Sequence, residues 1–391
     1  MKKFIQALLV GFVSVGMVAC SSSTPTSSTE PTTEATDGGA AATTDMKIAM
    51  VTDHGDITDQ SFNQTTYEAA KAFADANGLE FTYYKPTGDS TAERVAMIDT
   101  AVAEGYSVIV LPGFAFAEAI VETAAMYPDV KFVALDVSEG DLAGAAGTDT
   151  YAADNVYSAI YQEELAGYMA GYAAVKMGYK ELGFLGGMAV PAVIRYGFGF
   201  VQGADDAATE LGLTDVNIKY VYGGQFFGDA DITAVMDTWY QAGTEVVFAC
   251  GGGIYTSAAE AAVKTGGKVI GVDVDQAATI DGAYGDGITI TSAMKGLAAT
   301  VDTLLTAIQI GDWDSYKGQI QNLGLVSGDD PTSNYVQLPV DTTVWTDSFT
   351  EDDYVELVGK MYSGEVEVSN DTTAMPAVDS VTVDDQGAIK G

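Results

Sequence analysis

Short apolar runs alternate with amphipathic segments from Met46 onward, and this pattern begins a second time near residue 155. The first array predicts strands at 47–51, 80–84, 107–111 and 131–135, with helices at 61–77, 91–104 and 116–126. The second predicts a helix at 155–177, strands at 182–185, 217–222, 245–249 and 268–272, and helices at about 192–211, 231–242 and 256–265. Apolar runs rich in β-branched residues between helices are typical of parallel strands buried on both faces. Two such arrays predict an α/β protein with two doubly wound parallel-sheet lobes.

The elements after the second array determine how the lobes are connected. A strand at 287–293 and a helix at 296–310 follow, and late elements of this kind often return to the first lobe, which makes the crossings a hinge. One further helix is expected at about 351–361. The predicted bounds are 46–153 with about 274–300 for the first lobe, 154–273 with about 301–370 for the second, and 371–391 for an acidic C-terminal tail without regular structure.

The first 45 residues do not have the pattern of a folded domain. Lys2 and Lys3 precede an apolar stretch that ends in Met17-Val-Ala-Cys20, which predicts a signal peptide over 1–20 with lipidation of Cys20. The alternative is an ordinary signal peptide with an incidental cysteine. Residues 21–45 contain 13 Ser or Thr and no aromatic residue, as in a disordered tether. We therefore expect a protein attached by lipid to the outer face of the cytoplasmic membrane, and no later apolar run approaches 18 residues.

Charge and rare residues exclude several classes of function. The chain has 17 basic and 55 acidic residues and a net charge of −38, which leaves no basic patch for a nucleic-acid backbone. Its two cysteines, Cys20 and Cys250, exclude a disulfide framework or a cysteine-rich zinc site. The single histidine, His54, leaves no histidine pair for a metal and none to spare for a catalytic triad.

Three aspartates follow predicted strands, where open α/β sheets bind their ligands. Asp53, Asp136 and Asp273 each stand directly beyond an apolar run. Carboxylates facing one cleft would suit a polyhydroxylated ligand, because each accepts several hydrogen bonds. Three alternatives remain open: ordinary turn residues, a Ca²⁺ site, and a general acid–base pair. The residues lack the compact spacing of a calcium loop, and no nucleophile motif accompanies them.

Aromatic residues near two other strand ends suggest that the ligand contains a flat ring. Phe62 follows Ser61, which could cap the helix that begins there, and Phe226 and Phe227 follow the strand at 217–222. Rings on opposite lobes could sandwich a base, although core packing is the alternative for each of them. Gly251-Gly-Gly253 allows close backbone approach but is not a phosphate-binding motif, and the first strand lacks a dinucleotide fingerprint. Lys295 could pair with a carboxylate, donate to a ligand or lie on the surface.

Several of these segments resemble motifs of one family. The segment from Asp53 to Gln64, with its Asp-x-Gly-x-Ile-x-Asp-x-Ser-Phe-Asn-Gln pattern, is similar to the opening motif of the basic membrane lipoprotein family. That family comprises purine-nucleoside receptor-like substrate-binding proteins of ABC transporters. Further similarities are Glu164-Leu-Ala-Gly167, Phe184-Leu-Gly-Gly187, Gly252-Gly253, Ile270-Gly-Val-Asp-Val-Asp-Gln276 and, as a closing strand, Gly364-Glu-Val-Glu-Val368.

The resemblance implies a type I periplasmic-binding-protein fold that holds a nucleoside between its lobes. Phe62 and Phe227 would then stack on the purine from opposite sides. Asp53 and Asn63 would lie near the ligand and Asp136 at one of its polar edges, while Gly253, Asp273 and Lys295 would hold the ribose hydroxyls. The sequence departs from the family at His54, where a small residue is common. It also matches the family's Ser-Phe-x-Asp motif only loosely, which leaves the second ring open between Phe226 and Phe227.

The resulting prediction is a monomeric, lipid-anchored receptor that presents a nucleoside to an ABC permease, with no catalysis, cofactor, metal or nucleic-acid partner. Two alternatives remain. One is a binding protein for a sugar or another small ligand on the same fold. The other is an extracellular nucleoside-processing enzyme, which the scarcity of His and Cys argues against.

Overall fold

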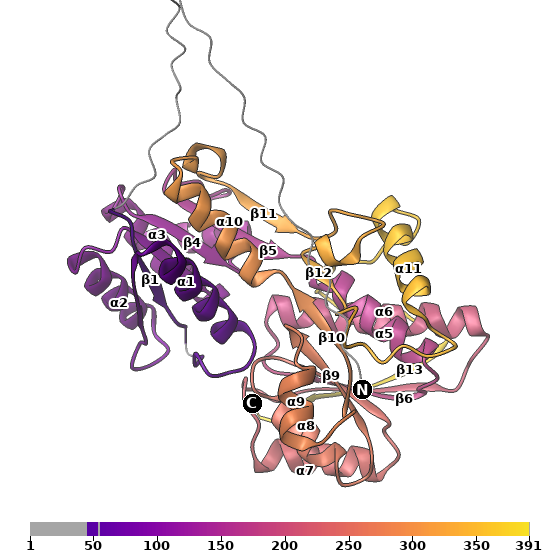
Figure 1. Cartoon of the computed structure of the whole chain (residues 1–391). Helices are drawn as coiled ribbons and strands as arrows, with labels where there is room; N and C mark the ends of the chain where they lie inside the picture. Colours follow the sequence, from indigo (N-terminus) through magenta and orange to yellow (C-terminus); the bar gives the residue numbers. More distant parts are fainter. Residues whose placement is uncertain (1–44, 54, 391) are drawn as a thin grey trace, which may run out of the picture. The chain divides into compact units, whose positions relative to one another are not determined.

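The computed structural model describes residues 45–53 and 55–390, and these residues form two β-sheets flanked by helices (Figure 1). The predicted signal peptide, Cys20, all but the last residue of the tether, and His54 lie outside the described residues. Most neighbouring strands run parallel, as the buried apolar runs predict, and among the strands of the described residues only β10 and β12 pair in antiparallel fashion.

The first sheet has six strands in the order β11-β5-β4-β3-β1-β2. Its strands are β1 (Lys47–Val51), β2 (Glu80–Tyr84), β3 (Val108–Pro112), β4 (Lys131–Leu135), β5 (Val156–Tyr161) and β11 (Ile320–Leu323). The helices of this lobe are α1 (Phe62–Asn77), α2 (Thr91–Ala103), α3 (Ala117–Met126), α4 (Glu139–Ala146) and α10 (Leu297–Gln309), with short 3₁₀ turns η1 (Phe114–Phe116) and η2 (Trp313–Ser315). Capping boxes at Ser90 and Ser138 fix the starts of α2 and α4.

The second sheet has seven strands in the order β12-β10-β9-β8-β6-β7-β13. Its strands are β6 (Glu181–Gly186), β7 (Val216–Tyr222), β8 (Val246–Cys250), β9 (Lys268–Asp273), β10 (Thr289–Lys295), β12 (Val336–Gln337) and β13 (Val381–Ala388). The helices are α5 (Glu163–Lys176), α6 (Pro191–Leu211), α7 (Ala230–Gln241), α8 (Tyr255–Ala262), α9 (Ala277–Tyr284) and α11 (Glu351–Ser363), with a 3₁₀ turn η3 (Pro331–Ser333). Every residue of the central strand β8 is buried, as expected for a strand covered on both faces.

Helices α5 and α6 lie unusually close together, because glycines remove the side chains between them. A Cβ atom at Gly167 would lie 2.0 Å from the carbonyl oxygen of Tyr196, and one at Gly199 would lie 2.0 Å from that of Glu164. Gly167 is part of the Glu-Leu-Ala-Gly motif, so the close approach of the two helices gives this motif a packing role.

Within the described residues, the chain crosses between the two sheets three times, at Gln162, at Gly296 and between Gly324 and Tyr335. The crossing segments are hydrogen-bonded to one another. The Gln162 amide donates to the Leu323 carbonyl (2.9 Å), Gly296 to Tyr335 (2.7 Å) and Tyr335 to Gly324 (3.0 Å). Three adjoining crossings form the hinge expected between the lobes.

The predicted lobe boundaries are wrong in several places. The segment read as one helix at 155–177 contains strand β5, which pairs with β4 and β11 in the first sheet. Strand β10 and helix α9, expected in the first lobe, belong to the second, where β10 pairs with β9. Helix α10 does return to the first lobe, where it packs beside α1 (Figure 1). Strand β11, which falls in the range 301–370 expected in the second lobe, also lies in the first sheet, beside β5. These positions are decided by pairing between strands that are distant in the sequence, and the local periodicity of the sequence does not predict such pairing.

The C-terminal tail is also more ordered than predicted. Strand β13 pairs in parallel with β7, from Val381 opposite Val216 to Ala388 opposite Tyr222, with a shift in register after Asp385. In contrast, residues 364–368, matched to a closing strand of the family, form no strand. The acidic composition of the tail predicts no regular structure, and strand β13 forms because it pairs with β7, which lies far earlier in the chain.

Candidate functional site

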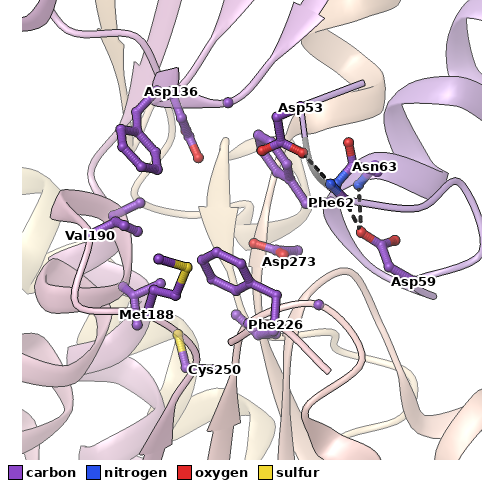
Figure 2. Close-up of a pocket in the computed structure, with 18 of the residues that line it drawn as sticks. Asp53, Asp59, Phe62, Asn63, Asp136, Met188, Val190, Phe226, Cys250 and Asp273 are labelled. Atoms are coloured by element: carbon purple, nitrogen blue, oxygen red, sulfur yellow. Dashed lines mark hydrogen bonds between the residues drawn. The ribbon is translucent and has the colours of Figure 1, made fainter. Parts of the chain in front are cut away.

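A cavity of about 730 Å³ lies between the carboxyl ends of strands from both sheets (Figure 2). All eight side chains or backbone positions predicted to contact a ligand are on its wall, namely Asp53, Phe62, Asn63, Asp136, Phe227, Gly253, Asp273 and Lys295. The residues that the strand-end rule and the motifs select therefore line one cavity, although Lys295 comes from the second sheet and not the first.

Lys295 is the centre of a buried charge cluster. Its Nζ lies 2.6 Å from Asp136, 3.5 Å from Glu163 and 3.6 Å from Asp273, and its side chain is only 3% exposed. Burial by itself lowers the pKa of Lys295, but the surrounding carboxylates raise it above its ordinary value, so the ammonium stays charged. Burial raises the pKa of Asp136, and Lys295 opposes that rise.

Aromatic rings and a second cation complete this cluster. Lys295 Nζ lies 4.5 Å from the ring centroid of Phe62 and 5.9 Å from that of Tyr196, within the range of cation–π attraction. Arg195 Nε donates to the fully buried Glu163 at 2.6 Å. A cation held next to an aromatic ring and several oxygens can orient a ligand that has both a flat ring and hydroxyl groups.

Backbone strain is concentrated at the same place. Among the described residues other than glycine, only Gln60, Asp136 and Asp273 have positive φ angles, of 56°, 60° and 66°. This conformation is uncommon for residues with a Cβ and costs about 1–3 kcal/mol, so it persists where the surrounding structure requires it. Asp136 and Asp273 are predicted site residues. Gln60 connects the two lobes, because its carbonyl accepts a hydrogen bond from the Gln276 side chain (2.9 Å).

The opening motif is organised by Asp59. Its carboxylate accepts from the backbone amides of Ser61 (2.9 Å), Asn63 (2.9 Å) and Gln64 (3.0 Å) at the start of α1. Ser61, expected to cap this helix, makes no side-chain cap bond and instead donates to Asp273 of the other lobe at 2.5 Å. The reason is that Asp59 already occupies the amides that Ser61 would cap.

Three polar atoms on the wall have no hydrogen-bond partner among the described residues. These are Oδ1 of Asn63, Oδ1 of Asp136 and the hydroxyl oxygen of Tyr196, all buried. Asp53 uses one carboxylate oxygen to accept from the Gly55 amide at 2.7 Å. Buried polar atoms are almost always paired, so these atoms indicate positions where a ligand or water completes the bonding.

The aromatic loop, residues 223–229, contributes two rings in different settings. Figure 2 shows the ring of Phe226 pointing into the cavity between Met188 and Asp273. Its position requires glycines beneath it, since a Cβ at Gly187 would lie 2.4 Å from the ring. Phe227, the ring that the family motif selects, is 61% exposed on the wall.

Gly253 has little hydrogen-bonding capacity left for a ligand. Its amide donates to the Phe226 carbonyl (2.8 Å), and its carbonyl accepts from the Thr256 hydroxyl (2.9 Å). Its visible role is to hold the aromatic loop against the start of α8.

Sequence reasoning missed several residues of the wall and its buried support. They are Asp59, Phe114, Glu163, Met188, Val190, Arg195 and Tyr196, together with Cys250, which was read only as a buried apolar residue. Met188 lies just beyond the end of β6, so the strand-end rule could have identified it, whereas Arg195 is the fifth residue of α6. Glu163 adjoins the Glu164-Leu-Ala-Gly167 motif. It follows strand β5, however, and the sequence pattern predicts that segment as part of a helix. Cys250 is buried, and burial raises the pKa of its thiol well above the ordinary value.

Two features are absent from residues 45–53 and 55–390, the part of the chain that the structure describes. No helix there has the length and apolarity needed to cross a membrane. No group of three or more His, Cys, Asp or Glu side chains in the same part of the chain is arranged to hold a metal ion.

Comparison with known proteins identifies the family. A family profile described as "ABC transporter substrate-binding protein PnrA-like" matches residues 46–328. The chain is 30% identical over 246 residues to the ABC transporter nucleoside-binding protein BmpA of Lactococcus lactis. The aligned residues cover 60% of this chain and 65% of that relative, which is slightly less than two thirds of its length. An uncharacterized lipoprotein of Pyrococcus furiosus is 26% identical over 292 residues, covering 72% of this chain and 69% of that one.

A solved structure confirms the fold. A solute-binding protein of an ABC transporter system from Aeropyrum pernix K1 superposes with a TM-score of 0.64 at 23% identity, covering 84% of this chain and 88% of that one. The expected type I periplasmic-binding-protein fold and the expected family are both confirmed, and the chain belongs to the Bmp family of PnrA-like ABC transporter substrate-binding proteins.

Proposed function

We propose that this protein captures a nucleoside, with preference for a purine base, between its two lobes and delivers it to an ABC permease. The observation that carries this proposal is one cavity that contains aromatic rings from both lobes beside the Lys295 carboxylate cluster. Rings suit a base, and carboxylates with an ammonium suit ribose hydroxyls. The similarity to a nucleoside-binding protein supports the same ligand class.

The proposed roles follow the positions of the side chains. Phe62 stacks on one face of the base, and a ring of the aromatic loop stacks on the other. Asp53, Asn63 and Asp136 receive hydrogen bonds at the polar edges of the ligand. Asp273 and Lys295 hold the ribose, while Gly253 keeps the loop in place beside it. Closure of the lobes about the three crossings completes the contacts.

Lipid attachment at Cys20 would keep the receptor on the extracytoplasmic face of the membrane, close to its permease. The Pyrococcus relative is named as a lipoprotein, which supports this arrangement. Replacing Cys20 with Ala should move the protein from the membrane fraction to the soluble fraction. We expect the receptor to act as a monomer, since closure requires a free cleft.

Titration calorimetry on the fragment from Met46 tests the ligand class. The fragment is unfolded and refolded to remove any ligand from the host, and then titrated with inosine, guanosine, adenosine, uridine, cytidine and ribose. Micromolar or tighter binding of purine nucleosides, with no heat from ribose, supports the proposal. Silence toward all nucleosides would contradict the proposed ligand and leave the fold unaffected.

Two other functions are separated by simple controls. A sugar-binding protein on the same fold would bind without stacking, so Phe62→Ala would leave its affinity almost unchanged. A nucleoside-processing enzyme would convert bound inosine, whereas a receptor returns it unaltered after prolonged incubation, as liquid chromatography would show.

A further inference from the structure

The C-terminal segment, defined as residues 379–390, lies along the outer edge of the second sheet. Asp205 fixes its start by accepting from the amides of Ser380 (2.7 Å) and Val381 (3.0 Å). Strand β13 then follows β7, and the Ile389 amide donates to the carbonyl of Tyr222 (2.8 Å), the last residue of β7. The segment therefore runs toward the carboxyl edge of the sheet, where the aromatic loop begins.

The backbone of Lys390 is packed against this loop. A Cβ atom at Gly224 would lie 2.5 Å from the Lys390 carbonyl oxygen, and Gly224 has a φ of 80°. Both facts favour glycine at this position, because a side chain would displace the C-terminal segment and strain the turn.

The Lys390 side chain contacts both ends of the loop. Its Nζ forms an ion pair with the carboxylate of Asp229 and donates to Gln225 Oε1 at 3.3 Å. Gln225 in turn donates to the Phe227 carbonyl and to Asp229, each at 2.9 Å. One lysine thus connects the residue before the two phenylalanines with the residue that caps helix α7.

The other side of the loop is held by residues at the start of helix α8. The Gly253 amide donates to the Phe226 carbonyl at 2.8 Å, and the Asp229 amide donates to the Ser257 hydroxyl at 3.0 Å. The loop is therefore fixed between the start of α8 and the C-terminal segment. Of these two supports, only the C-terminal segment lies beyond residues 46–328, the part that matches the family profile.

We infer that the C-terminal segment is a positioning element of the binding site, in which Lys390 holds the aromatic loop in the conformation that presents Phe226 and Phe227 to the ligand. The effect on ligand affinity rests on the proposed nucleoside function, whereas the effect on the loop does not.

The test compares Lys390→Met with the wild type in two measurements on the fragment from Met46. Hydrogen–deuterium exchange of residues 223–229 should become faster, and the affinity for inosine should fall about 5-fold, as expected for loss of one ion pair whose side chains are 31% and 28% exposed. Lys390→Arg should restore both properties. Lys360→Met, which removes an exposed ion pair with Glu356 on α11, should change neither.

A second variant separates positioning from general loosening of the tail. Gln386→Ala removes the bond from Trp239 Nε1 to Gln386 (3.1 Å) in the same segment but leaves the lysine contacts in place. If Gln386→Ala reproduces the Lys390→Met effects, or if Lys390→Met leaves loop exchange unchanged, the positioning role is overturned. If the wild type binds no nucleoside, the proposed function fails, while the exchange measurement still decides the role of Lys390.

Discussion

The ammonium of Lys295 lies 2.6 Å from the carboxylate of Asp136, although the two residues stand at the ends of strands in different sheets. Each lobe therefore supplies one half of a buried ion pair at the base of the ligand cavity. Glu163 and Asp273 lie within 3.6 Å of the same ammonium, so Lys295 contacts carboxylates from both lobes next to the hinge.

Replacing Lys295 with Met should destabilise the protein strongly. The change removes the cation beside the buried carboxylates of Asp136 and Asp273, whereas Glu163 keeps its ion pair with Arg195. Breaking a buried pair from one side typically costs about 3–5 kcal/mol. Urea unfolding at pH 8 and pH 5 measures the effect, which should be smaller at pH 5 because the stranded carboxylates can take up protons. Lys317→Met removes only an exposed pair with Asp314 and should cost under about 1 kcal/mol. Equal losses in both variants would show that the cluster is not critical.

Glu164→Gln should stabilise the protein at alkaline pH. Burial raises the pKa of Glu164 from 4.5 to about 7, so the folded state binds this proton more tightly than the unfolded state. The folded state therefore loses stability as the pH rises from about 4.5 to 7, by up to roughly 3 kcal/mol at 1.36 kcal/mol per unit. The variant should unfold at higher urea than the wild type above pH 7 and at similar urea near pH 4.5. Glu356→Gln, at a side chain 67% exposed, should show no such divergence.

Gly167→Ala should lower stability by about 1–3 kcal/mol or more, because the added methyl group overlaps a backbone oxygen of α6 and not a movable side chain. The control is Gly282→Ala in α9, where a Cβ meets nothing within 4 Å and helix propensity predicts a gain of up to about 1 kcal/mol. Chemical unfolding of both variants tests the close contact of α5 with α6. A stable Gly167→Ala protein would contradict it.

Phe226→Ala should weaken purine nucleoside binding by about 1–3 kcal/mol, the usual value of one base–aromatic stack. The reason is that the Phe226 ring already lies in the cavity, whereas Phe227 is 61% exposed. Phe227→Ala is the matched control and should have the smaller effect in calorimetric titration. The reverse order would support the family motif, which selects Phe227.

Inosine 5′-monophosphate should bind at least about 10-fold more weakly than inosine at low ionic strength, and added salt should narrow the gap. Among the described residues, the cavity wall has three basic side chains, Lys85, Arg195 and Lys295, against seven aspartates, Asp53, Asp56, Asp59, Asp89, Asp136, Asp141 and Asp273. A phosphate group is therefore repelled. Comparable affinities for the two ligands in calorimetry would show that the phosphate group of the bound ligand lies too far from these aspartates to be repelled.

The sequence by itself determined the α/β class and the positions of Asp53, Asp136 and Asp273. These features depend on local patterns: apolar runs identify buried parallel strands, and the residues beyond their carboxyl ends line the ligand side of the sheet. The motif resemblance added Asn63 and gave each residue a role to be tested. The local patterns and the family motifs both depend on residues that are close together in the sequence.

The tertiary structure decided what depends on distant pairing. It placed β5 in the first sheet and β10 in the second, so that Lys295 meets Asp136 across the lobes. It directed the Ser61 hydroxyl to Asp273, and it brought Lys390 to the aromatic loop. No periodicity along the chain reports these contacts, because they arise when strands far apart in sequence become neighbours and bury their shared faces.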